Sequence, residues 1–280
     1  MKFNNIKKRL INALEKILES PLMISFSVLV IVVAIVLLIS MPMYLADAHN
    51  FLINILSELH GMIFDLFVIG ILITWLNQLG QKKRLIRSYK DEIDDFRMWE
   101  SEESAYRTVG NIKRLNRYKI YDIDLVSCYL SRTNLSYVTL KGANLNNANA
   151  SNSTLVDINL ELARLNRTNF ENSNLNQANL TGAYASGTNF KDAYMIKVNL
   201  LNAFLIKADF KNAFLMEANL RGANLTSANL DNANLYKADL REAVGLTIEQ
   251  LSNVRTLYLA KFDDSVLEEL RLKYPALLGR

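Results

Sequence analysis

The chain has 280 residues, of which 50% are hydrophobic and 21% are charged, and its net charge is +4. This composition excludes a disordered, highly charged tail protein. A single Cys excludes an internal disulfide framework and a Cys-based zinc finger, and only two His are available for catalysis. The small positive charge does not by itself indicate binding to nucleic acid.

Two apolar stretches near the N-terminus predict transmembrane helices. No residue between Glu19 and Asp47 carries a formal charge, and a helix of that length exceeds the ~30 Å hydrocarbon core of a bilayer. A second, less apolar candidate runs from Phe51 to Leu79. We therefore assign residues 21–80 to two transmembrane helices, and residues 1–20 to a cytoplasmic amphipathic segment with Lys on its polar face.

Basic residues flank both stretches and predict their orientation. By the positive-inside rule, both termini lie in the cytoplasm and the chain resides in the lipid bilayer of a bacterial inner membrane. A cleaved signal peptide is the alternative for the first stretch, because Ala46-Asp47-Ala48 resembles a cleavage site. The basic residues are Lys2, Lys7, Lys8, Arg9 and Lys16 before the first stretch, and Lys82, Lys83, Arg84, Arg87 and Lys90 after the second.

Three polar residues lie in the second stretch: Glu58, His60 and Asp65. Acids inside a membrane are candidates for functional sites. Asp65 is expected to lie in the hydrocarbon core of the membrane, where it forms a polar contact with another helix or lines an ion or water path. Glu58 and His60 alternatively lie in the outer interfacial region of the membrane. A metal site that joins them to Asp47 and His49 is a weak alternative, since the spacing matches no known ligand pattern.

Residues 81–117 predict a charged helical linker. Tyr89, Ile93 and Phe96, and then Trp99, recur at roughly helical spacing. The acidic residues 91–95 are expected to form a solvated face. The mixture of charges fits a helical stalk or a contact between subunits.

From residue 118 to residue 243 the sequence repeats every five residues. Each of the 25 repeats has an apolar centre at a multiple of five; the residue just before it is Asn or Asp in 16 of them, and the residue two positions before it is mostly small, Ala in 14 of them. A period of five fits neither a helix nor a flat strand, so the chain must bend once per repeat and wind into a solenoid. Phe170, Phe190 and Phe210 replace Leu at steps of 20, which indicates four repeats per coil.

This pattern resembles the pentapeptide-repeat family. The resemblance implies that residues 118–245 form an all-β, right-handed quadrilateral β-helix, preceded here by the two-helix transmembrane hairpin. The three Phe centres and Cys128, which takes the small-residue position, are expected in its core.

Residues 246–280 are expected to form a short helical cap, as in members of the family. Thr247 with Gln250, and Ser265 with Glu268, have the spacing of capping boxes.

No catalytic set, cofactor site or metal site is found, so we predict that the chain is not an enzyme and needs no cofactor. Some members of the family mimic DNA and bind DNA gyrase, which requires an acidic face. Residues 118–243 contain 12 Lys plus Arg and 11 Asp plus Glu, and this near-neutrality disfavours mimicry and binding to nucleic acid.

Outward-facing aromatic and apolar residues beside the centres predict two protein-interaction walls. The walls lie ten residues apart, half a coil, and therefore on opposite sides, where they permit side-by-side assembly. Alternatively, the linker or the C-terminal helices cover part of each wall. The candidates are Tyr184, Phe204 and Ile206 on one wall, and Tyr194, Ile196, Phe214, Met216 and Tyr236 on the other.

The predicted function is a membrane-anchored scaffold whose cytoplasmic solenoid assembles with copies of itself or with a protein partner. The main alternative is an oligomerising membrane effector, in which Glu58 and Asp65 line a leak that depolarises the cell. Growth arrest with dye entry that is lost on Asp65→Leu distinguishes the effector from the scaffold.

Overall fold

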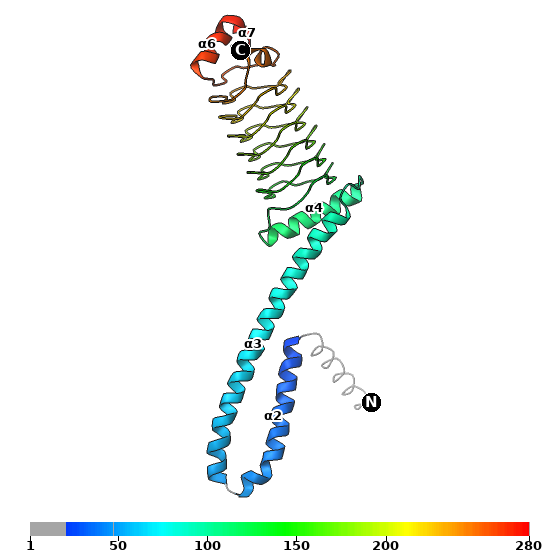
Figure 1. Ribbon diagram of the computed structural model, residues 1–280, viewed down its shortest axis with the longest axis vertical. Coiled ribbons are helices and arrows are strands. Elements are labelled where there is room, and N and C mark those ends of the chain that lie inside the picture. The colour runs from blue at the N-terminus through cyan, green and yellow to red at the C-terminus, as the bar shows by residue number, and fades with distance from the viewer. Residues whose placement is uncertain (1–20, 47, 280) are drawn as a thin grey trace, which may run out of the picture. The chain divides into compact units, whose positions relative to one another are not determined.

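The computed structural model describes residues 21–46 and 48–279 (Figure 1). The chain divides after Leu85 into two units, 1–85 and 86–280. The predicted amphipathic segment, residues 1–20, lies outside the described residues.

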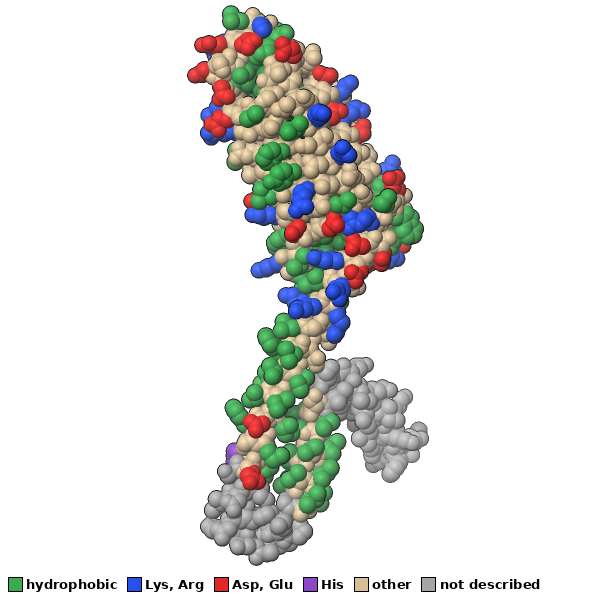
Figure 2. All heavy atoms as spheres, in the orientation of Figure 1, with side chains coloured by type: hydrophobic (Ala, Val, Ile, Leu, Met, Phe, Trp, Pro, Cys, Tyr) green, Lys and Arg blue, Asp and Glu red, His purple; other side chains and the backbone are tan. Residues whose placement is uncertain are grey.

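Two helices, α2 (Pro21–Ala46) and α3 (Ala48–Asp95), contain the apolar stretches (Figure 1). Among the described residues, one stretch of α3, Glu58–Asp95, is long and apolar enough to cross a membrane, and Ser25–Ile39 is a shorter apolar stretch. Hydrophobic side chains are exposed along both helices (Figure 2). Helix α3 continues 15 residues beyond the predicted boundary at residue 80, because no proline interrupts this polar, helix-forming sequence.

The repeat segment winds with 20 residues per coil. Single-residue parallel bridges join each position before a centre to its equivalent 20 residues later, from Asp124↔Asn144 to Asn224↔Val244. In the described repeats the pairing consists of these isolated bridges rather than of extended strands. Two residues after each centre from Leu125 to Leu240 the backbone has a positive φ, even where the residue is Leu162 (φ 56°), so this turn bends the chain once per repeat.

The hydrogen bonds explain why Asn and Asp recur. Within residues 160–164 every backbone N–H has a partner, as buried backbone requires. Three N–H groups bond to neighbouring coils, the N–H of Ala163 closes the turn onto the carbonyl of Leu160 (3.0 Å), and the N–H of Glu161 donates to Oδ1 of Asn159 (3.0 Å). The Asn side chain therefore satisfies the one N–H that no carbonyl reaches.

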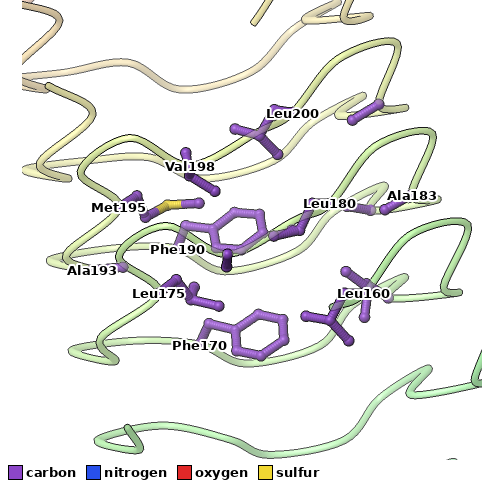
Figure 3. Close-up of a cluster of buried hydrophobic side chains, with 14 of the residues drawn as sticks. Leu160, Phe170, Leu175, Leu180, Ala183, Phe190, Ala193, Met195, Val198 and Leu200 are labelled. Atoms are coloured by element: carbon purple, nitrogen blue, oxygen red, sulfur yellow. The ribbon is translucent and has the colours of Figure 1, made fainter. Parts of the chain in front are cut away.

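The centres fill the interior as stacked columns (Figure 3). The rings of Phe170, Phe190 and Phe210 stack with centroids 5.5 and 5.0 Å apart, and all three side chains are fully buried. Cys128 is also buried, and desolvation raises the pKa of its thiol to about 11.

Helix α4 (Glu102–Arg117) packs on the first coil. Its residues Ile112 and Leu115 are fully buried, and Ile93 near the end of α3 joins the same core. Oδ1 of Asn116 accepts a hydrogen bond from the N–H of Thr139 (2.8 Å). Residues 86–117, most of the predicted linker over 81–117, thus cap the solenoid in the structure.

Helices α5 (Ile248–Ser252), α6 (Asp264–Lys273) and α7 (Pro275–Leu278) follow the repeats. The Thr247–Gln250 capping box is confirmed, with hydrogen bonds of 3.2 and 2.8 Å. The Ser265–Glu268 box is wrong: α6 begins at Asp264, two residues earlier than that box requires, with Asp263 at the cap position. Between α5 and α6 the chain pairs with the last coil through Asn234↔Thr256 and Asp239↔Lys261, so this end is capped too.

Candidate interaction surfaces

The first wall is the surface formed by Arg164, Arg167, Tyr184, Phe204, Ile206 and Lys207. Tyr184 and Phe204 occupy equivalent positions in successive coils, and their rings stack with centroids 5.0 Å apart and planes 1° apart. Both replace the Asn or Asp of the repeat. Their side chains are 45% and 42% exposed, and Ile206 is half-buried beside them. The register of 20 residues thus forms a continuous aromatic stripe on the outside of the solenoid.

Three cations of the first wall lie next to this stripe. Arg164 lies in the same column as Tyr184, one coil earlier, and Arg167 and Lys207 occupy turns. All three side chains are exposed. Within the described part of the chain, the ion pairs of the repeats involve other residues, so none of these three cations is neutralised by a carboxylate.

The second wall is formed by Tyr194, Ile196, Lys197, Phe214, Met216, Glu217, Tyr236 and Lys237. It repeats the aromatic arrangement: the Tyr194 and Phe214 rings stack at 4.9 Å, and Tyr194 is 48% exposed. Its charges are partly paired: Lys197 pairs with Glu217 at 3.7 Å, and Lys237 lies over the Tyr236 ring, 5.1 Å from its centroid. The remaining apolar members, Ile196, Phe214, Met216 and Tyr236, are half-buried.

The segment after the repeats covers part of the second wall. The Arg255 guanidinium lies 5.8 Å from the Phe214 ring centroid, and the Tyr258 ring stacks on Tyr236 at 5.9 Å. Sequence reasoning raised such covering for both walls. The sequence did not reveal these contacts, because the apolar residues of this segment, Leu257 and Phe262, are shifted by two residues from the multiples of five that mark the repeats.

Other exposed aromatic residues lie where the sequence indicated none. Trp99, suggested as part of a helical face, is 58% exposed, because α3 ends at Asp95 and the chain turns before α4. Tyr106 on α4 and Tyr137 in a turn are also exposed. The exposure of these three side chains could have been predicted only from their positions relative to the helix ends and the turns.

The polar residues of the apolar stretch all lie on α3. Glu58, His60 and Asp65 are exposed, and Nδ1 of His60 lies 2.5 Å from the Leu56 carbonyl oxygen. No group of metal-binding side chains occurs among the described residues. Asp47, part of the weak metal alternative, lies outside them.

An open hollow of about 720 Å³ lies on a third face, between Lys237, Asp239, Arg241 and Lys261. Hydrogen bonds from Arg241 lower the pKa of the Asp239 carboxyl, so the charges in this hollow are partly paired. On the visible face of the repeats, acidic, basic and hydrophobic side chains are interspersed, and no acidic surface dominates it (Figure 2).

The repeats match a family model described as pentapeptide repeats, in eight copies, over residues 123–161, 143–182, 163–202, 173–212 and 205–241. Among solved structures, the chain is similar to full-length QnrB1, a plasmid-mediated fluoroquinolone resistance protein: 20% identity, 54% of this chain, 84% of that chain, TM-score 0.39.

It is also similar to HetL of the cyanobacterium Nostoc sp. strain PCC 7120, with 22% identity and a TM-score of 0.22. The match covers 54% of this chain and 93% of HetL. A third similar structure is Rfr23 of the cyanobacterium Cyanothece 51142, with 25% identity and a TM-score of 0.16. The match covers 55% of this chain and 98% of Rfr23. No curated protein matches the chain.

Proposed function

Since residues 123–241 belong to the pentapeptide-repeat family, we propose that the chain is a non-enzymatic scaffold held at a bacterial inner membrane. Its two apolar helices anchor it, and its solenoid, wound as the right-handed quadrilateral β-helix of the family, lies in the cytoplasm. There the solenoid assembles with its own copies or with a protein partner. The observation that supports this most is the pair of exposed aromatic stacks on opposite walls.

The closed ends of the solenoid favour contacts through its sides. An open end presents unpaired N–H and C=O groups that add strands from other molecules. Here α4 packs on the first coil, and residues 253–262 pair with the last one. The walls remain, and large aromatic side chains on such surfaces are typical of protein interfaces.

Two features support anchoring in a membrane. The Glu58–Asp95 stretch of α3 has the length and composition of a membrane span, and the apolar side chains of α2 are exposed. Basic residues flank the stretches in the pattern that predicts cytoplasmic termini.

The test replaces the apolar side chains of both walls. Phe204→Lys together with Phe214→Lys is expected to reduce the mass of the detergent-solubilised protein, measured by light scattering after size exclusion. Leu162→Lys is the matched control, because Leu162 is 49% exposed but lies on neither wall. Equal masses for all three proteins, with unchanged circular dichroism, would contradict assembly through the walls.

The effector alternative depends on Asp65, which is exposed within an apolar stretch of α3. In an assembly of helices such a carboxylate lines a polar path or bonds to a neighbour. Arrested growth with dye entry upon induction, abolished by Asp65→Leu, favours this alternative over the scaffold.

A further inference from the structure

We propose that the first wall binds an acidic amphipathic helix of a protein partner, which lies along the axis of the solenoid. This inference rests on the proposed function, for which it specifies the chemistry of one partner. It depends on the difference in charge between the two walls and on the spacing of the cations on the first one.

The two walls have the same aromatic geometry but different electrostatics. Each presents two stacked rings, with centroids 5.0 Å apart on the first wall and 4.9 Å apart on the second. Among the described residues, the three exposed cations of the first wall have no carboxylate partner, whereas on the second wall Lys197 pairs with Glu217 and Lys237 lies 5.1 Å from the Tyr236 ring centroid. Unneutralised cations around an apolar stripe are complementary to an acidic, partly apolar surface.

The spacing of two cations fits a helix. Arg167 and Lys207 occupy equivalent turns two coils apart, hence about 10 Å at ~4.8 Å per coil. Residues i and i+7 of an α-helix lie on one face at nearly the same spacing, about 10.5 Å. Acids at these positions can each meet one cation, while apolar residues at i+3 and i+4 contact the exposed edges of Tyr184 and Phe204.

Gly187 leaves room for such a helix. It occupies the turn between those of Arg167 and Lys207, and a Cβ placed on it would lie 3.7 Å from the Arg167 Cγ, so the stem of Arg167 packs beside this glycine. Gly187 adds no side chain of its own between the two cations. An incoming apolar side chain can approach the rings between them.

The ring geometry favours a protein over nucleic acid. Bases of single strands bind by stacking on open aromatic faces. Here one face of each ring is covered by the other ring, and the outer faces point toward Arg164 and Asn224 in the adjoining coils. The edges remain exposed, and they contact aliphatic side chains rather than bases.

The experiment measures binding of a labelled 15-residue helical peptide to the full-length protein in detergent, by fluorescence anisotropy. The peptide carries Glu at i and i+7 and Leu at i+3 and i+4; a second peptide has Gln at both Glu positions. We expect the acidic peptide to bind at least tenfold more tightly than the Gln peptide, and more weakly as salt rises. Arg167→Glu with Lys207→Glu should weaken binding at least tenfold.

Lys197→Glu with Lys237→Glu on the second wall is the matched control and should change binding less than twofold. Equal losses from both double variants, or no preference for the acidic peptide, would overturn the proposal. Tighter binding of a single-stranded 15-mer oligonucleotide would overturn it as well, since the ligand would then be nucleic acid.

Oligomer mass separates this inference from the proposed function. If Phe204→Lys with Phe214→Lys disperses the protein but the acidic peptide does not bind, the scaffold stands and the acidic helix is wrong. If Arg167→Glu with Lys207→Glu itself disperses the protein, the first wall binds a second copy, and the proposal of a separate acidic partner fails. We expect this variant to retain the wild-type mass.

Discussion

Ala218 shows how little space the small-residue position allows. Its side chain is 1% exposed, and its N–H closes a turn onto the Leu215 carbonyl (3.1 Å). Ala218→Leu adds three carbons to a filled interior and is expected to lower the free energy of unfolding by ~1–3 kcal/mol. Thermal and denaturant melts check this.

Ala218→Ser is the matched control. At the same position of another repeat, the hydroxyl of Ser173 donates to the Phe170 carbonyl (2.6 Å) while fully buried. A serine therefore fits in size and in hydrogen bonding, and it should change stability much less than leucine does. Equal melting of the Leu variant and the wild type would show that the small-residue position tolerates bulk.

Cys128 makes stability depend on alkaline pH. Burial raises the pKa of its thiol from an ordinary value near 9 to about 11, so between these values the unfolded chain loses a proton that the folded chain keeps. Stability is therefore full below about pH 9 and falls as pH rises, by about 2–3 kcal/mol in all by pH 11.

Cys128→Ala isolates this effect from the other groups that titrate in the same range. The loss of unfolding free energy between pH 9 and pH 11 should be smaller in the variant than in the wild type, as measured by denaturant melts at each pH. Parallel curves for the two proteins would contradict a thiol held neutral by burial.

Among the secondary structure elements, α4 decides whether the first coil is covered. Leu115 is fully buried at the end of α4 and its carbonyl accepts hydrogen bonds from the N–H groups of Tyr118 and Ile120. Leu115→Ala should cost ~2–5 kcal/mol by the cavity it leaves, and should speed hydrogen exchange in the first coil before the last one. Tyr106→Ala, which truncates an exposed side chain of the same helix, is the control.

A uniform loss of protection along all coils would mean that the cap and the solenoid unfold as one unit. A local loss in the first coil would show that α4 covers an edge that is otherwise open. Exchange measured by mass spectrometry distinguishes the two results, since peptides of the first and last coils differ in sequence.

The coil of four repeats could be predicted from the sequence because the residues that stack on one another vary together. Phe170, Phe190 and Phe210 recur at steps of 20 because stacked positions share one pocket, and the bridges have the same register. The helices lack such internal constraint. The spacing of Ile112 and Leu115 defines an apolar face but not what it packs against, so α4 could not be told from a stalk.

Some features of the two walls likewise follow from the repeat, and others do not. The outward direction of Tyr184 and Phe204 follows from the repeat, and their stacking follows from the register. The covering of Phe214 by Arg255 depends on a segment that is out of register with the repeats. The absence of an ion pair at Arg167 among the described residues depends on which carboxylates lie in adjoining coils. Three-dimensional contacts of this kind leave no signal in the sequence of one chain.

For the whole molecule, the division after Leu85 has a direct consequence. Residues 86–280 contain their own core, which Ile93 near the end of α3 joins, and both ends of the solenoid are covered within this unit. A chain that begins at Ile86 is therefore expected to fold and to remain in the aqueous fraction after ultracentrifugation. The full chain should remain in the membrane pellet after washing with salt or carbonate, and dissolve only in detergent.

The full chain carrying Phe204→Lys and Phe214→Lys is the control, because it removes the proposed assembly contacts but keeps the apolar stretches of α2 and α3. It should pellet with membranes as the wild type does, since burial of those exposed side chains in lipid does not depend on the walls. Release of the full chain by carbonate would contradict anchoring by the helices. Sedimentation of a folded 86–280 fragment with membranes would place the membrane contact on the solenoid unit instead.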